Sequence, residues 1–105
     1  MKRLVFRPEA EADLAAAVEF YDKKRAGLGK DLIGAVERAL TAIADAPGAQ
    51  PLFLKERPYR KYTLARFPCM IVFREDDKEI TALAVLHAKR LPSGRAAVVH
   101  DTAAP

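Results

Sequence analysis

The chain has 105 residues, half of them hydrophobic and 30% charged, and carries a formal net charge of +4. This length and composition predict one globular domain with a core of its own, which excludes a disordered chain and a scaffold that depends on metals or disulfides. The one cysteine, Cys69, excludes an internal disulfide and a cysteine-based zinc site, and its apolar neighbours predict a buried thiol in a reducing cytosol. No apolar run approaches the ~18 residues that span a bilayer, and the amino terminus lacks the apolar region of a signal peptide. We therefore expect a cytoplasmic protein without a membrane anchor.

The amino-terminal stretch predicts a short strand and then a helix. Residues 3–7 include the β-branched Val5 and the aromatic Phe6, as is typical of a short strand, and Pro8 ends this pattern. Apolar residues then recur at helical spacing from Ala10 to Tyr21, and a proline suits the first position of a helix. The pattern predicts a first helix over residues 8–25.

A second apolar stripe runs from Leu32 to Ile43 and predicts another amphipathic helix that ends before Pro47. The glycine-rich segment 27–29 between the two stripes predicts a tight turn, so the helices should form an antiparallel hairpin. In the irregular connection that follows, residues 52–54 are apolar and are expected to pack as a local plug.

Two later runs, residues 69–73 and 80–86, are apolar at nearly every position, which is typical of strands covered on both faces. The polar residues 74–79 between them are too few for a helix, so the two strands should form an antiparallel hairpin. The predicted fold is an α+β domain of order β-α-α-β-β-β, an antiparallel sheet with a helical hairpin packed on one face. We expect this domain to cover residues 1–92 and residues 93–105 to form a flexible tail.

The positive charge is unevenly distributed. Residues 1–54 hold eight basic and eight acidic residues, whereas residues 55–105 hold ten and six, so the whole excess lies in the half with the predicted sheet. Such an excess indicates an anionic partner, either nucleic acid or an acidic protein. The alternative is a solvated edge, since basic side chains on edge strands also prevent aggregation. The basic residues at the margins of the strands are Arg60, Lys61, Arg66, Arg74, Lys89 and Arg90.

Several chemistries are excluded by the absence of their motifs from the sequence. No glycine-rich phosphate loop is present, the two histidines lack metal-ligand spacing, and Ser93 is the one serine, so no serine-based triad is available. The signatures of the common RNA-binding sheets are also missing. The sequence therefore calls for no metal and no cofactor.

His87 is the first candidate for proton transfer, because it ends the last predicted strand and the unperturbed pKa of a histidine lies near neutrality. A metal-free ribonuclease needs a base, an acid and cations that stabilise the phosphorane. His87 could be one proton carrier, but a second is hard to find. The alternative is a histidine that is hydrogen bonded for structural reasons. The cations available to a nuclease are Arg60, Arg66, Arg74, Lys89 and Arg90, and the candidates for the second proton carrier are Glu56, Glu79, Tyr59 and Tyr62.

Five segments, taken in order, resemble the RelE/ParE superfamily of type II toxin–antitoxin toxins. They span nearly all of residues 3–92. They are the run Pro8 to Leu14, Phe20 and Tyr21 before the turn at 27–29, Val36-Glu37 with Ala39-Leu40, Arg66-Phe67-Pro68 before Ile71 to Phe73, and Ala84 to His87 with Arg90.

The resemblance implies a small bacterial toxin in a hetero-oligomer with a cognate antitoxin that neutralises it. RelE-like members cut messenger RNA on the ribosome, and there the catalytic residues of this chain would be His87, Arg66 and Arg74. ParE-like members poison DNA gyrase without nuclease chemistry, and the glycine turn at 27–29 is more similar to this branch. In either branch the target-binding residues would be Arg60, Lys61, Arg66, Lys89 and Arg90.

The chain departs from common relatives at Cys69, where an aromatic residue often follows Arg-Phe-Pro. A third alternative is a degenerate toxin that is retained only as a partner for its antitoxin. Loss of toxicity on induction would distinguish this alternative from the other two.

Overall fold

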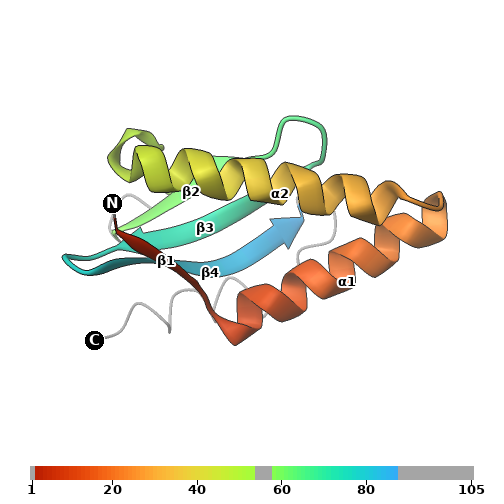
Figure 1. Ribbon diagram of the computed structural model, residues 1–105, viewed down its shortest axis with the longest axis horizontal. Coiled ribbons are helices and arrows are strands. Elements are labelled where there is room, and N and C mark those ends of the chain that lie inside the picture. Colours follow the sequence, from red (N-terminus) through yellow and green to blue (C-terminus); the bar gives the residue numbers. More distant parts are fainter. Residues whose placement is uncertain (1, 54–57, 88–105) are drawn as a thin grey trace.

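The computed structural model describes residues 2–53 and 58–87. In chain order these residues form the elements β1 (Arg3–Phe6), α1 (Pro8–Lys24), α2 (Leu28–Asp45), a short 3-10 helix η1 (Pro47–Ala49), β2 (Tyr59–Thr63), β3 (Cys69–Glu75) and β4 (Glu79–His87). The two helices run antiparallel and lie across one face of the sheet (Figure 1). The predicted α+β class, the element order and the helical hairpin are confirmed. The expected domain limits, 1–92 and 93–105, fall on residues outside the described ranges and stay a prediction.

The sheet has the strand order β1-β4-β3-β2. The strands β2, β3 and β4 are antiparallel as predicted, but β1 pairs with β4 in parallel, so the sheet is mixed and not fully antiparallel. A parallel neighbour requires a long crossover between the two strands. Here the whole of α1, α2, β2 and β3 lies between β1 and β4 and provides it.

The helical hairpin is tighter than the sequence suggests. Gly27 has a φ of 89°, in the left-handed region that glycine favours, but α2 already begins at Leu28, so Gly29 lies inside the helix and not in the turn. The Gly29 N–H donates to Asp22 Oδ1 at 2.8 Å. A Cβ atom at Gly29 would lie 2.8 Å from Val18 Cγ1, so this glycine allows the two helices to approach closely.

A carboxylate of α1 completes the edge of β4. Just beyond the end of β1, the Arg7 N–H donates a backbone hydrogen bond to the Ala82 carbonyl oxygen of β4, at 3.1 Å. Further along β4, Asp13 Oδ2 accepts a hydrogen bond from the Val85 N–H at 3.0 Å. The side chain of a helix thus replaces a strand as the partner of this amide.

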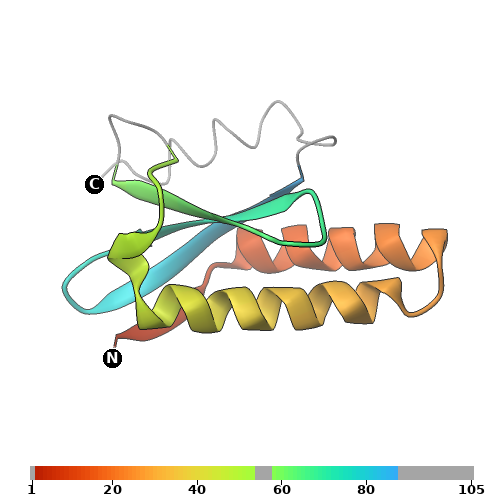
Figure 2. The same cartoon turned by 90° about the horizontal axis from the view of Figure 1, so that it is seen from above.

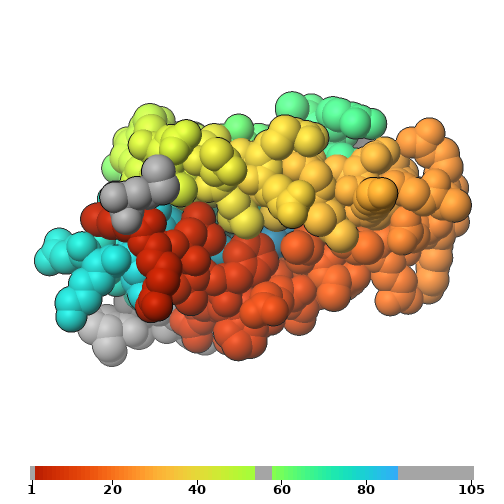
Figure 3. All heavy atoms as spheres, viewed as in Figure 1, coloured from red at the N-terminus to blue at the C-terminus, as the bar shows by residue number. Residues whose placement is uncertain are grey.

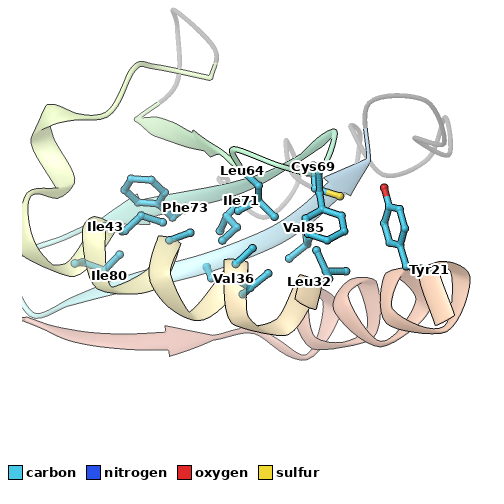
Figure 4. Packing of buried hydrophobic residues seen from close by; sticks show 14 residues of the cluster. Tyr21, Leu32, Val36, Ile43, Leu64, Cys69, Ile71, Phe73, Ile80 and Val85 are labelled. Carbon is cyan, nitrogen blue, oxygen red and sulfur yellow. The ribbon is translucent and has the colours of Figure 1, made fainter. Parts of the chain in front are cut away.

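The main core lies between the helices and the sheet and includes Leu32, Val36 and Ile43 of α2 and Ile71, Phe73 and Ile80 of the strands (Figure 4). The space-filling view shows α1 and α2 covering most of this side of the sheet (Figure 3). No helix in the described part of the chain is long and apolar enough to cross a membrane.

Figure 2 shows α1 and α2 on one side of the sheet. The face turned away from them, here called the second face, is also apolar. Its buried residues are Tyr59, Val72, Leu83, Ala84 and Leu86, with Phe53 and Met70 packed against them. Within the expected plug 52–54, Phe53 joins this cluster, whereas Leu52 is 46% exposed and Leu54 lies outside the described residues.

Candidate functional site

The carboxyl-terminal turns of α1 and the end of β4 bring Tyr21 and His87 together. The Tyr21 hydroxyl and His87 Nε2 lie 2.9 Å apart, within hydrogen-bonding distance. In Figure 4, Tyr21 extends from α1 toward the sheet beside the end of β4. A tyrosine buries its ring and needs a polar partner for its hydroxyl, and the imidazole provides one.

Two further aromatic rings, Phe20 and Phe67, surround this pair and form with it an aromatic cluster of Phe20, Tyr21, Phe67 and His87. Tyr21 packs edge-on against Phe67, with ring centroids 5.0 Å apart, and against Phe20 at 5.1 Å. Phe20 also packs edge-on against His87, at 5.8 Å. Such edge-to-face contacts fix the orientation of each ring, so His87 sits in a rigid setting.

Burial keeps two neighbouring groups protonated, the Tyr21 hydroxyl and the Cys69 thiol. Burial raises the pKa of the Tyr21 hydroxyl, and the adjoining Cys69 raises it further. Burial likewise raises the pKa of the Cys69 thiol, although its hydrogen bond with Tyr21 opposes this shift. Both groups are therefore neutral near pH 7. Neither is activated as a nucleophile, because the thiolate is the reactive form of cysteine.

Two cations border the aromatic cluster. The Arg66 guanidinium lies over the Phe67 ring at 5.9 Å, and Lys24 Nζ lies over the Phe20 ring at 4.9 Å. Both side chains are exposed. Arg66 was a predicted site residue, and the structure places it at the same end of the molecule as His87.

The other predicted cations are elsewhere. Arg60 Nη1 donates to the Gln50 carbonyl at 2.6 Å, which ties β2 to the preceding segment. Lys61 is opposite Val72 in the register, and so lies on the second face. Arg74 lies five residues along β3 from Cys69, which pairs with His87, so a span of about 17 Å separates Arg74 from His87. Lys89 and Arg90 fall outside the described residues.

None of the described candidates for a second proton carrier lies in the row of the sheet that holds Cys69 and His87. Glu79 begins β4 at the opposite end of the strand and forms an ion pair with Arg3 at 3.2 Å. Tyr62 is paired with Ile71, and Tyr59 with Arg74. Glu56 lies outside the described residues. Within the described ranges, no group of three or more histidines, cysteines or carboxylates could hold a metal ion.

The partner of His87 was missed by sequence reasoning. Tyr21 entered as the end of an apolar stripe and, like Phe67, as part of the family resemblance, and neither of them nor Lys24 was given a role at a site. One signal was available, since a tyrosine that ends the buried stripe of a helix brings a hydroxyl that needs a partner. The identity of that partner depends on the distance between α1 and β4, which the sequence does not show.

A comparison with solved structures supports the fold. Among solved structures, a chain described as "Chromosomal ParDE TA system from P. aeruginosa" superposes with a TM-score of 0.62 and 24% identity, over 81% of this chain and 94% of that one. At that identity the likeness concerns the fold. The search of curated protein sequences found no significant match.

The family follows from a second comparison. The model of the ParE toxin of type II toxin–antitoxin systems, parDE, matches residues 4–92. The chain therefore belongs to the ParE toxin family, and the predicted RelE/ParE resemblance, with its preference for the ParE-like branch, is confirmed.

Proposed function

We propose that this ParE-family chain inhibits DNA gyrase by binding, without nuclease chemistry, and that a cognate antitoxin neutralises it in the cytoplasm. One observation carries the first part of the proposal. The His87 imidazole is joined to the buried Tyr21 hydroxyl, and the candidate acids and bases Glu79, Tyr59 and Tyr62 lie in other parts of the sheet. General acid–base cleavage needs two proton carriers within reach of one phosphate.

The exposed border of the aromatic cluster is the surface that we assign to the target. Arg66 and Lys24 each rest on an aromatic ring, which limits their rotamers, and neither has an ion-pair partner in the described part of the chain. Preorganised cations of this kind lose little entropy on binding and favour a negatively charged partner surface. Of the expected target-binding residues that lie in the described ranges, Arg66 is the one that fits this surface.

We propose that the antitoxin contributes an acidic or amphipathic segment that binds along a sheet edge and the helical hairpin. The edge strand β1 and the side chain of Ile33 in α2, which is 40% exposed, support this placement. Co-expression with the neighbouring gene should give a stable hetero-complex. A fully monomeric, soluble toxin with no adjacent partner gene would contradict the proposal.

A RelE-like ribosome-dependent endonuclease is the second candidate, because Arg66 and His87 lie at the same end of the molecule. Incubating the purified protein with gyrase and relaxed DNA, and in parallel with programmed ribosomes, separates the two. We expect loss of supercoiling and intact messenger RNA. Messenger RNA cleavage with normal supercoiling would favour the nuclease, and no effect in either assay would favour a degenerate toxin.

A further inference from the structure

The loop between β2 and β3 presents Arg66 between two buried side chains. Leu64 is 4% exposed and Phe67 is 6% exposed, whereas Arg66 between them is exposed. The Leu64 N–H donates to the Cys69 carbonyl oxygen at 2.9 Å, and the Cys69 N–H donates to the Phe67 carbonyl oxygen at 2.7 Å. Hydrogen bonds and buried side chains thus fix the backbone on both sides of Arg66, unlike in a mobile loop that makes few such contacts.

The contact between Arg66 and the Phe67 ring depends on the conformation of this loop. The guanidinium carbon lies 5.9 Å from the ring centroid, within the range of a cation–π contact. Successive side chains of an extended chain point in opposite directions, so neighbours in the sequence meet in this way only where the backbone turns. Lys24 differs, because it follows Phe20 by four residues on α1 and the helix itself brings the two together.

The Phe67 ring is itself held from the side of the helices. It packs edge-on against Tyr21 of α1, with centroids 5.0 Å apart and an interplanar angle of 74°. The Tyr21 hydroxyl lies 2.9 Å from His87 Nε2, which fixes this ring in turn. Arg66 forms no ion pair with any described residue, so the Phe67 ring is the contact that directs its guanidinium.

We propose that Phe67 is a positioning residue for Arg66 on the surface that binds the target. The proposal rests on the proposed function, and it gives a buried aromatic side chain a role in inhibition that is separate from its role in the core. The ring limits the directions in which the guanidinium points before the partner arrives, so less entropy is lost on binding.

Relaxation of the arginine Nε–H groups, measured by NMR on the full chain, tests this inference without the target. In the wild type, the Arg66 Nε–H should be more ordered than that of Arg25, which is exposed and has neither a ring contact nor an ion pair among the described residues. Phe67→Leu keeps an apolar side chain but removes the ring, and should lower the order of Arg66 to the level of Arg25.

Phe73→Leu is the matched control for this measurement. Phe73 is 1% exposed in the same core, and within the described ranges no cation lies over its ring. The control should lower the urea midpoint at least as much as Phe67→Leu does, and should leave the order of the Arg66 Nε–H unchanged.

Supercoiling by gyrase gives the second readout. We expect Phe67→Leu to weaken inhibition about two- to fivefold, as for the loss of a cation–π contact at an exposed site. In an Arg66→Ala background the same substitution should weaken inhibition no further, because a positioning residue acts only through the side chain that it positions. Phe73→Leu should inhibit gyrase as the wild type does.

Two results would overturn the proposal. The first is an Arg66 Nε–H that is as mobile as that of Arg25 in the wild type, and it still decides should Phe67→Leu fail to fold. The second is an equal loss of inhibition from Phe67→Leu with and without the Arg66 side chain. Wild-type protein that leaves gyrase unaffected would contradict the proposed function, and the NMR comparison would still show whether Phe67 positions Arg66.

Discussion

The Tyr21 hydroxyl and His87 Nε2 are 2.9 Å apart, although 66 residues separate them in the chain. The contact joins the end of α1 to the end of β4. Tyr21 is 7% exposed, and burial raises the pKa of its hydroxyl, so the tyrosine stays neutral beside the imidazole. A histidine that is hydrogen bonded to a neutral, buried tyrosine is suited to fixing the end of α1 to the end of β4.

Tyr21→Phe should therefore affect stability and not toxicity. The variant keeps the ring contacts with Phe67 but loses the hydroxyl, so we expect the free energy of unfolding to fall by about 0.5–1.5 kcal/mol in urea titrations. Tyr62→Phe is the matched control, because the Tyr62 side chain makes no hydrogen bond in the described structure. Equal stability of the two variants would show that the Tyr21 contact contributes nothing.

Asp13→Ala tests the hydrogen bond from the Val85 N–H of β4 to the Asp13 carboxylate of α1. The substitution leaves the Val85 N–H without its acceptor, and we expect a loss of about 1–3 kcal/mol in the free energy of unfolding. Asp13→Asn keeps an acceptor oxygen and should recover most of this loss. Glu11→Ala removes an exposed carboxylate from the same helix and should cost no more than about 0.5 kcal/mol. A larger loss for Glu11→Ala than for Asp13→Ala would contradict this assignment.

Two glycines of α2 should respond in opposite directions to alanine. At Gly29 a Cβ would lie 2.8 Å from both the Val18 Cγ1 atom and the Val18 carbonyl oxygen, so the helices must separate at a cost of about 1–3 kcal/mol. At Gly34 the nearest atom is the flexible end of Arg38 at 3.4 Å. Alanine there should be neutral or stabilise the helix by up to about 1 kcal/mol. Thermal unfolding of both variants measures the difference, and a stabilised Gly29→Ala would show that the hairpin is looser than described.

The turn between β3 and β4 should contribute stability that depends on pH. Asp76 Oδ1 accepts hydrogen bonds from the N–H groups of Lys78 and Glu79 at 2.8 and 2.9 Å, and these bonds lower the pKa of Asp76 below its ordinary value of 3.8. The contribution of the charged carboxylate is therefore present above pH 3.8 and lost as the pH falls through the lowered pKa. Wild type should be more stable than Asp76→Asn at pH 7, and the two should converge at acid pH.

Asp77→Asn is the control for this pH dependence, since Asp77 is exposed in the same turn. Urea midpoints at several pH values give the comparison. A difference in stability between wild type and Asp76→Asn that grows toward acid pH would contradict this prediction.

Local patterns in the sequence were sufficient for most of the fold. Apolar residues at helical spacing predicted both helices, and two continuous apolar runs predicted the β3–β4 hairpin, because these elements depend on neighbouring positions. The parallel pairing of β1 with β4 could not be read in this way, since it joins residues 76 apart, as in the pair Arg3 and Glu79. Gly29 was assigned to a turn, because no local pattern shows that Val18 lies against it.

The site was less predictable for the same reason. His87 and Arg66 were recognised by residue type, but charge alone grouped Arg66 with Arg60, Lys61 and Arg74. The register of β2 and β3 separates these cations between the two faces and the two ends of the sheet. Tyr21 was hidden in an apolar stripe, so its contact with His87 emerged only from the packing of α1 on β4.

The central claim is that toxicity requires a binding surface and no catalytic histidine. Its most direct test is gyrase supercoiling in the presence of His87→Ala, with circular dichroism to verify the fold and Arg66→Glu as the variant of the proposed binding surface. We expect His87→Ala to inhibit gyrase within about threefold of wild type, and Arg66→Glu to lose about tenfold in potency, as for a charge reversal at an interface. Folded His87→Ala that has lost toxicity, together with wild-type cleavage of messenger RNA on ribosomes, would contradict the claim.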